Sequence, residues 1–467
     1  MRVRIIFFAA CLLLCGYIFA ESEDIQPSAG APVYIRVIDI HGNVTTRPQT
    51  LEAFFDFRIG EELDTAKLRS TRENILRTQL YTEVDIAAYM LDDGARIVVT
   101  VKEAVRLQLI WGGSYSTTRY GVPDLWIVLR GGATLYNFRG RMEELSIEGK
   151  VWALRGVNAL WTKPFLSTPY YISAGAGVET YPDEALPLDF VDLFVTMAAG
   201  KMLGKHSKIA LSATPMRQNN RVVESQMDDS PIPTPNIPEY RSLYEAFGAV
   251  TFTSDYRNSR FDTRSGWYET FDVRTNWLYH DNVIPGVYTP FFEFTNDFKY
   301  YLPLLFGDVL TTHLRLTMRD TDAGTYHRLT YGGTGSMRGY HDKALGWNFV
   351  ANSAAFVSLK YTKPIWKTQP LNIPLVESIY QNAGLITIRF DLSLIADYVR
   401  LFDKPLGPLA LESQTQDALG LGFGLRTSFL ELRQSGNVEV VFGKRERPDH
   451  SGFDWKPMLH FSLDRGF

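Results

Sequence analysis

Apolar and polar residues alternate in short segments along most of the chain beyond residue 104. Apolar residues recur at every second position in residues 313–320, and largely so in residues 270–279 and 419–429. A period of two predicts β-strands, because successive strand side chains point to opposite faces of a sheet. Counting such segments from Val105 to Phe467 predicts about 16 strands, an even number that is typical of closed antiparallel membrane barrels.

Residues 33–104 follow a different pattern. A strand is predicted at residues 34–40, then a short helix at residues 50–57. A second helix is predicted at residues 67–78, where Asp64 can cap its start. Two further strands, at residues 84–89 and 96–101, meet at a turn that ends in Gly94. The predicted order is β-α-α-β-β, a small α+β domain of about 70 residues.

Residues 1–20 have the composition of a secretory signal peptide. Arg2 and Arg4 precede an apolar run that ends at Ala20. A lipidation site at Cys15 is a second interpretation, but the preceding Leu14 is large for such a site. A membrane helix is a third, but the run is shorter than the roughly 20 residues needed to cross a bilayer. We therefore expect cleavage after residue 20 and a polar linker over residues 21–32.

Composition narrows the class of protein. Both cysteines, Cys11 and Cys15, lie in the predicted signal peptide, so we expect no disulfide and no cysteine-based metal or catalytic site. Loss of Arg2 and Arg4 changes the net charge from −4 to −6, which does not suggest binding to nucleic acid. An aromatic fraction of 13%, a mean hydropathy of −0.12 and an export signal fit a transmembrane β-barrel.

A secreted all-β hydrolase or binding protein would share these features. No serine-histidine-aspartate motif, carboxylate pair or metal-ligand cluster stands out in the sequence. We therefore predict no enzyme activity, catalytic residue, metal or cofactor.

The segment from Tyr331 to Tyr340 is the most distinctive candidate site. It surrounds Arg338 with glycines and Tyr340, namely Gly332, Gly333, Gly335 and Gly339. Between two predicted strands it must form a loop, spanning about residues 321–347. A disordered linker is one interpretation. Phosphate binding is another, but it would need a following helix start and a Lys-Ser/Thr pair. The third is an internal clasp in which Arg338 pairs with a buried carboxylate.

A later predicted strand, residues 386–394, supplies a carboxylate. Its alternation places Asp391 and Arg389 on the polar face, which lines the lumen of a barrel. We hypothesise that Arg338 pairs with Asp391 and fixes the loop. The alternative is that Asp391 pairs with its neighbour Arg389 or with water.

Several segments resemble one protein family. Residues 38–43, 59–60, 80–84 and 97–103 resemble a POTRA domain, the periplasmic module that precedes barrels of the BamA/TamA outer-membrane assembly superfamily. Residues 336–340 resemble the (V)RGF/Y loop motif of that superfamily, and Asp391 resembles the aspartate of strand thirteen that meets its arginine. Further resemblances lie in residues 254–258, in residues 420–426, and in a C-terminal targeting signal that contains Phe461 and Phe467. Lys360 stands where the family often has glutamate.

The resemblance implies a mainly β fold, with a 16-stranded antiparallel transmembrane β-barrel at residues 105–467 preceded by one POTRA domain at residues 33–104. It places the barrel in the bacterial outer membrane, the POTRA domain in the periplasm, and residues 331–340 in the sixth extracellular loop, folded into the lumen. A second long loop is expected at residues 216–241.

Two functions follow from the resemblance. One is assembly or insertion of outer-membrane proteins through a weak seam between the first and last strands. The other is translocation of a polypeptide through the lumen. The implied partners are outer-membrane lipid, client polypeptides bound at the POTRA domain and the seam, and periplasmic or lipoprotein accessory factors.

Overall fold

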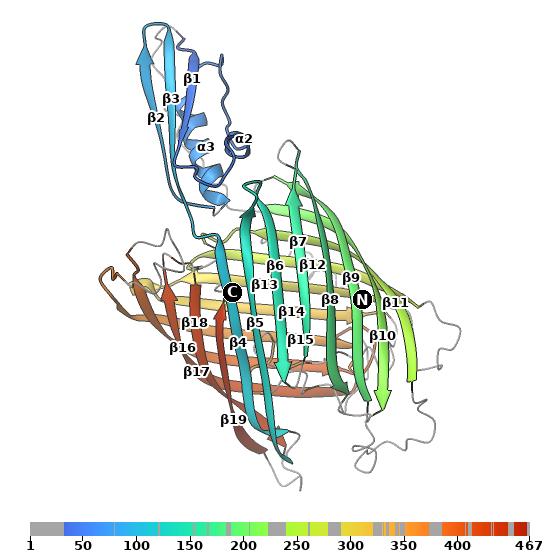
Figure 1. Cartoon of the computed structure of the whole chain (residues 1–467). Coiled ribbons are helices and arrows are strands. Elements are labelled where there is room, and N and C mark those ends of the chain that lie inside the picture. Colours follow the sequence, from blue (N-terminus) through green and yellow to red (C-terminus); the bar gives the residue numbers. More distant parts are fainter. Residues whose placement is uncertain are drawn as a thin grey trace, which may run out of the picture.

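The chain forms a small N-terminal domain and a large closed barrel, as a computed structural model of all 467 residues shows (Figure 1). The barrel contains sixteen strands and the N-terminal domain has a three-stranded sheet, so the predicted fold class is confirmed. The residues described here are 32–78, 80–119, 122–152, 155–165, 168–183, 188–204, 206–222, 240–259, 262–278, 291–320, 329, 331–332, 336–340, 345, 351–372, 385–406, 408–409, 413–430, 432, 434–446 and 453–464. The predicted signal peptide and most of the predicted linker lie outside them.

The N-terminal domain has the predicted order of elements. It contains β1 (Ile35–His41), α2 (Pro48–Glu52), α3 (Thr65–Arg77), β2 (Tyr81–Leu91) and β3 (Gly94–Glu103). Asp64 caps α3 by accepting a hydrogen bond from the Ala66 N–H at 2.8 Å. The sheet order β1-β3-β2 leaves β2 at one edge. The two helices cover one face of this sheet, and a single apolar core joins them to it.

The barrel strands follow one another in chain order around the cylinder. They are β4 (Leu107–Arg119), β5 (Val122–Phe138), β6 (Glu143–Trp152), β7 (Arg155–Pro164), β8 (Tyr170–Asp183), β9 (Leu188–Leu203), β10 (Ser207–Val222), β11 (Tyr240–Asp255), β12 (Gly266–Leu278), β13 (Phe292–Pro303), β14 (Val309–Arg319), β15 (Ser353–Lys367), β16 (Ile388–Phe402), β17 (Thr415–Phe429), β18 (Gln434–Glu446) and β19 (Phe453–Asp464). A short 3-10 turn, η2 (Leu305–Gly307), joins β13 to β14. We call the end of the barrel next to the N-terminal domain the near rim, and the opposite end the far rim.

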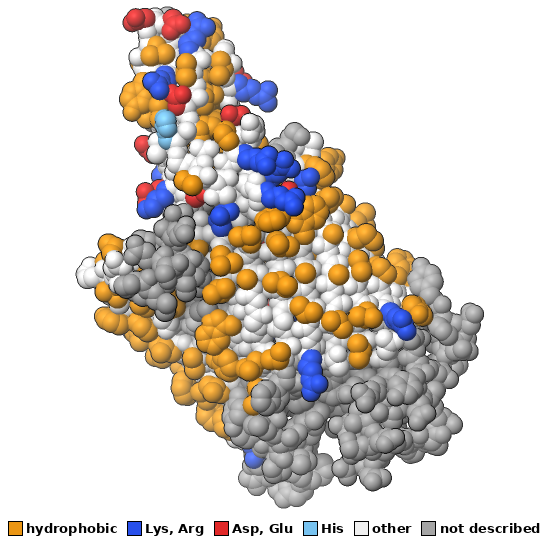
Figure 2. All heavy atoms as spheres, in the orientation of Figure 1, with side chains coloured by type: hydrophobic (Ala, Val, Ile, Leu, Met, Phe, Trp, Pro, Cys, Tyr) orange, Lys and Arg blue, Asp and Glu red, His pale blue; other side chains and the backbone are white. Residues whose placement is uncertain are grey.

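The alternation of apolar and polar residues corresponds to the outer and inner faces of the barrel. On β17, Leu421, Phe423 and Leu425 are all exposed outward. On β16, Asp391 and Ser393 are buried inward, whereas Leu392 and Leu394 are exposed. Figure 2 shows hydrophobic side chains spread over the outer face, with Lys and Arg side chains at the near rim. The apolar positions therefore form an outer belt, as a barrel surrounded by lipid requires.

Two predicted loop and strand boundaries were wrong. The predicted loop at residues 216–241 is shorter, because β10 continues to Val222 and β11 begins at Tyr240. Ile386, the first residue of the strand predicted at residues 386–394, precedes β16 and is fully buried beside Leu432. Among the described residues, no helix is long and apolar enough to cross a membrane.

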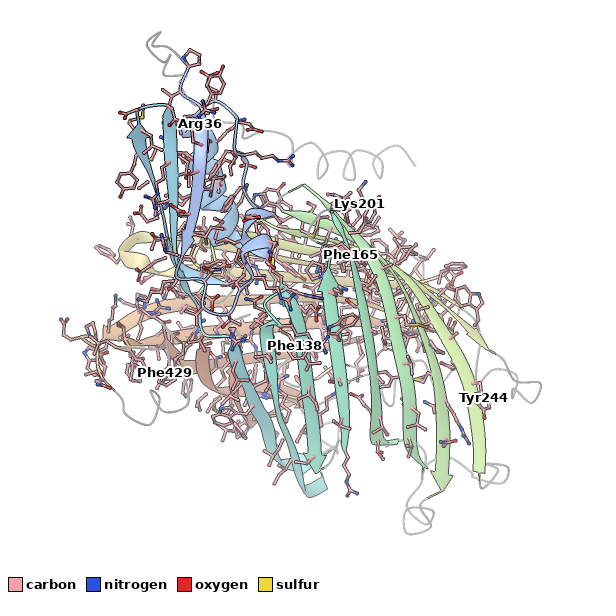
Figure 3. All side chains as sticks on the ribbon, turned by 45° about the horizontal axis from the view of Figure 1, so that its top comes forward. Arg36, Phe138, Phe165, Lys201, Tyr244 and Phe429 are labelled. Atoms are coloured by element: carbon pink, nitrogen blue, oxygen red, sulfur yellow. The ribbon has the colours of Figure 1, made fainter. Side chains whose placement is uncertain are left out.

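The N-terminal domain contacts the hairpin between β5 and β6. The labelled Phe138 marks this hairpin beneath the domain in Figure 3, at the near rim. Thr46 is buried at the contact, where its hydroxyl accepts a hydrogen bond from Asn137 Nδ2 at 2.7 Å. The same hydroxyl donates to Glu103 Oε1 at 2.6 Å. Gly140 O accepts a hydrogen bond from the Thr50 hydroxyl at 2.9 Å. Side chains from three distant parts of the chain thus join the domain to the barrel.

Candidate functional site

The glycine segment lies between β14 and β15, the eleventh and twelfth strands of the barrel. Its two ends are held together by backbone hydrogen bonds in both directions between Tyr331 and Leu345, at 3.0 and 2.8 Å. Ser336 closes a tighter turn inside it: its hydroxyl donates to Gly332 O at 2.8 Å and accepts from Gly332 N at 3.0 Å. The predicted site residues Gly333 and Gly335 lie outside the described residues.

Arg338 extends from this segment to the inner wall of the barrel. Its guanidinium makes two hydrogen bonds to Asp397 on β16, from Nε and from Nη2, each at 2.7 Å. The Arg338 backbone N–H donates to the same carboxylate at 3.2 Å. The Asp397 side chain is fully buried and that of Arg338 is 11% exposed. This is the bidentate geometry that a guanidinium and a carboxylate favour.

A second carboxylate and a second cation complete the cluster. Arg338 Nη1 lies 3.4 Å from Glu439 on β18, and Arg338 Nη2 donates to the Ser358 hydroxyl on β15 at 2.8 Å. Lys360, also on β15, pairs with Glu439 at 2.7 Å. Two positive and two negative groups therefore face one another inside the barrel. We call Arg338, Ser358, Lys360, Asp397 and Glu439 the loop anchor.

Glycines on the wall let the loop backbone approach closely. A Cβ on Gly443 of β18 would lie 2.2 Å from Gly339 O, and one on Gly420 of β17 would lie 2.4 Å from Arg338 O. Gly339 itself has a φ of +88°, a conformation that glycine adopts without strain. Tyr340, the last residue of the motif, donates from its hydroxyl to Lys444 O. These contacts show why glycines are needed on the loop and on both strands.

An apolar cluster surrounds the loop anchor. Met337 is fully buried, and Tyr331 and Tyr340 are nearly so. They pack with residues of the inner wall, which are Ala354 and Phe356 of β15, Val399 and Leu401 of β16 and Ala418 of β17. The loop is therefore joined to the wall by apolar burial as well as by charge.

The predicted partner of Arg338 was wrong. Asp391 and Asp397 both lie on the inner face of β16, six residues apart, which is about 20 Å along a strand. The loop enters at the far rim, and β16 runs from the near rim to the far rim. Asp397 is therefore the carboxylate within reach of Arg338. Alternation alone does not distinguish two inward carboxylates on one strand.

Asp391 and Arg389 belong to a second ion network at the near rim. Arg389 pairs with Asp391 at 3.0 Å, the alternative that the sequence left open. Arg389 also pairs with Asp262, in the turn between β11 and β12, at 2.6 Å. Arg264 of the same turn lies 3.4 Å from Asp391. These ion pairs therefore do not involve the glycine segment. They connect the turn between β11 and β12 to β16 inside the barrel.

Several residues of the site have a weak signal in the sequence. Glu439 and Ser358 lie on strands where alternation marks only an inward face. Lys360 stands where the family that the sequence resembles often has glutamate. Its ion pair with Glu439 explains how a cation is accommodated at this position. The spacing of glycines in residues 420–426 did single out one strand that the loop crosses.

A cavity of about 740 Å³ lies inside the barrel between the glycine segment and the wall formed by β12, β13 and β14. Arg274, Glu293 and Arg315 line the wall side, and Tyr331 and Ser336 line the loop side. Arg274 pairs with Glu293, and Arg315 pairs with Asp297. Among the described residues, no group of three or more His, Cys, Asp or Glu could hold a metal ion.

The barrel closes where β19 pairs with β4, and this seam is short. Its described ladder contains five residue pairs, from Leu459–Tyr115 to Leu463–Trp111. Other neighbouring barrel strands are paired over seven to fifteen positions in the described chain. Pro457 of β19 lies two residues before Leu459, just outside this ladder, and has no backbone N–H. Because the ladder with β18 runs unbroken past Pro457, the missing donor faces β4.

On the outer side of the seam, aromatic rings cross from one strand to the other. Phe461 of β19 packs against Trp111 of β4, with ring centroids 6.0 Å apart. It also covers Gly113, where a Cβ would lie 2.9 Å from the Phe461 ring. Phe461 was predicted as part of a C-terminal targeting signal, and that role stays a prediction. Phe467, the other predicted residue of the signal, lies outside the described residues.

Comparisons with known proteins agree on the architecture. Residues 33–104 match the POTRA family, surface antigen variable number repeat, and residues 207–389 match the Omp85 superfamily domain. A search of curated proteins finds no match.

Solved structures with a similar fold include BamA from Haemophilus ducreyi lacking POTRA domains 1–3, with a TM-score of 0.58 and 16% identity over 94% of this chain and 86% of that one. CdiB from Escherichia coli has a TM-score of 0.57 and 12% identity, over 92% and 76% of the two chains. CdiB from Acinetobacter baumannii has a TM-score of 0.55 and 12% identity, over 92% and 74%. A barrel of this kind implies a place in the bacterial outer membrane. Residues 33–104 are therefore a POTRA domain, and residues 207–389 are an Omp85 superfamily domain within the closed barrel of sixteen strands.

Proposed function

We propose that the protein assembles or inserts other outer-membrane proteins, using the seam between β4 and β19. The observation that carries the proposal is the five-pair ladder at this seam. A ladder with fewer pairs has fewer backbone hydrogen bonds, so the barrel would open here at lower cost than at any better-paired junction of the described strands. An open seam would offer unpaired strand edges to a client strand.

The POTRA domain would supply a second edge. Its sheet order leaves β2 unpaired on one side, and an extended client peptide could add there as a further strand. In this arrangement the POTRA domain and the near rim lie in the periplasm, and the far rim lies outside the cell. The glycine segment is then the sixth extracellular loop, held in the lumen by the loop anchor. Accessory periplasmic proteins or lipoproteins would bind on the periplasmic side.

Translocation of a polypeptide through the lumen is the second candidate. The cavity beside β12, β13 and β14 favours it, because charged and hydroxyl side chains there would suit a hydrated chain. In either case the protein works without catalysis, as assembly and translocation factors of the superfamily do.

Depletion of the protein, followed by proteomics of the outer membrane, tests the proposal. Insertion predicts a general loss of barrel proteins. Loss of one exported protein, with other barrels at normal abundance, would favour translocation. Unchanged outer-membrane and secreted proteomes would contradict both functions.

A further inference from the structure

One side chain joins the loop anchor to the seam. His460 of β19 is 1% exposed, and its Nε2 accepts the Gly339 backbone N–H at 3.4 Å. His460 stands opposite Glu439 on β18 and opposite Ser114 on β4, so it lies within the five-pair ladder itself. The motif arginine and its neighbouring glycine are therefore bound to adjacent strands, β18 and β19, at the same level of the barrel.

The chemistry of this contact fixes the role of the ring. To accept from a backbone N–H, Nε2 must be unprotonated, so the proton is on Nδ1. No hydrogen-bond partner for Nδ1 is found in the described part of the chain. A buried polar atom without a partner is costly, so apolar packing alone does not explain a histidine here. The hydrogen bond that its Nε2 accepts from the loop does explain why a histidine stands at this position.

The position of β19 makes this contact important for the seam. The strand is held to β18 by twelve pairs but to β4 by five. Inside the barrel His460 contacts the loop, and outside it the next residue, Phe461, packs on Trp111. A shift of Gly339 therefore acts within the shortest ladder between described barrel strands.

We propose that His460 is a positioning residue that couples the loop anchor to the seam. With the loop seated, His460 holds β19 in register with β4, and release of Arg338 from its carboxylates loosens the seam. The proposal rests on the proposed function only in that seam opening is the event being controlled; the coupling itself can be measured without any client.

A cysteine pair across the seam provides the measurement. Tyr115 and Leu459 are register partners, and Cys11 and Cys15, the only native cysteines, precede the described chain. Protein that lacks only the predicted signal peptide, residues 1–20, and carries Tyr115→Cys and Leu459→Cys is reconstituted in liposomes, and the fraction that forms a disulfide in a short oxidant pulse reports the closed seam. Heat-modifiable migration on gels confirms that each variant is a folded barrel.

In this background, His460→Leu should lower the closed-to-open ratio by about 2- to 10-fold, the effect of one lost hydrogen bond. His460→Gln, which keeps an acceptor, should restore most of it. Arg338→Lys should lower the ratio as well. Adding His460→Leu to Arg338→Lys should then give less than the product of the two effects, because both act on one linkage. His206→Leu is the control, since His206, next to β10, hydrogen-bonds to Asp255 O and contacts neither the loop anchor nor β19 in the contacts described, and it should have no effect on the ratio.

A ratio unchanged by His460→Leu would overturn the coupling, as would independent, multiplicative effects of the two substitutions. The proposed function fails separately: if the cross-linked protein still inserts clients at the parental rate, seam opening is not required, whatever His460 does to the ratio.

Discussion

Arg338 keeps its charge in a buried position because two carboxylates and a hydroxyl surround its guanidinium. Such a cluster is weak evidence for added stability, because removing charges from water is costly. It is strong evidence for a specified geometry, since a bidentate pair and two glycine contacts leave the loop one way to lie against the wall. The residues that matter most are those whose loss would leave a charge unpaired.

Asp397→Asn tests this at the residue scale. It removes the main charge partner of Arg338 and leaves a buried cation, a change that typically costs about 3–5 kcal/mol. We expect the temperature at which the barrel unfolds on gels to fall, and a cysteine placed on the glycine segment to become accessible to a water-soluble maleimide. Unfolding is measured by heat-modifiable migration.

Asp391→Asn is the matched control, because it removes an equally buried carboxylate from the same face of β16. It should disturb the near-rim network without exposing the loop. If Asp391→Asn exposed the loop as much as Asp397→Asn, the assignment of Asp397 as the partner would be wrong.

The limits of the sequence are clear at these two residues. The motif and the period of two predict that Arg338 meets an inward carboxylate of β16. Choosing between Asp391 and Asp397 requires knowing how far the loop descends into the lumen. That depth depends on Gly420, Gly443 and the apolar cluster around Met337, which come from four strands and have no common sequence pattern.

At the scale of elements, the joint between the N-terminal domain and the β5–β6 hairpin is unusual. Asn137, Arg139 and Met142 all have positive φ values, although none is glycine. Such conformations cost energy and persist where surrounding contacts hold them. Here the contacts are Asn137 with Thr46 and Gly140 with the start of α2, which fix the domain against the barrel.

Thr46→Val tests the joint, because valine has nearly the same shape and no hydroxyl. The change leaves Asn137 Nδ2 without its acceptor and removes one of the donors to Glu103 Oε1, at a cost of about 1–3 kcal/mol. We expect faster hydrogen–deuterium exchange in residues 44–50 and 137–142, measured by mass spectrometry. Thr46→Ser keeps the hydroxyl and should exchange like the parent. Equal exchange in all three proteins would show that the joint does not depend on this hydrogen-bond chain.

Elements are also where the sequence is most informative. Strand number, the helix capped by Asp64 and the order β-α-α-β-β follow from local periodicity, which survives folding because each strand has one apolar face. The joint does not follow, since Thr46, Glu103 and Asn137 are far apart in the chain and individually ordinary. Strand ends such as that of β10 were also missed, because polar residues there continue the ladder beyond the apolar belt.

At the scale of the whole molecule, the barrel wall separates two environments, hydrocarbon outside and a polar lumen inside. Its outer face is apolar, and its interior holds paired charges, hydroxyls and a returning loop. The two ion networks lie at different depths, the loop anchor toward the far rim and the Asp262–Arg389 network at the near rim. The loop anchor holds the returning loop against β15, β16 and β18, and the near-rim network ties the β11–β12 turn to β16, whereas β4, at the seam, has only a short ladder to β19. A closed wall that is stabilised by internal ion pairs and has one short ladder suits the opening at this junction that we propose.

Leu211 and Ser212 test this arrangement, because they are neighbours on β10 with opposite facing. Leu211 is 65% exposed on the outer face, and Ser212 faces the interior. Leu211→Arg would place a cation against hydrocarbon, at a cost of about 2–4 kcal/mol near the bilayer midplane. We expect its folded fraction in liposomes to fall well below that of Ser212→Arg, in which the same side chain reaches a polar lumen. Both are compared by denaturant titration in liposomes and in detergent. If Ser212→Arg were the more damaging substitution in lipid, the assignment of outer and inner faces would be reversed, and neither the lumen site nor the seam could work as proposed.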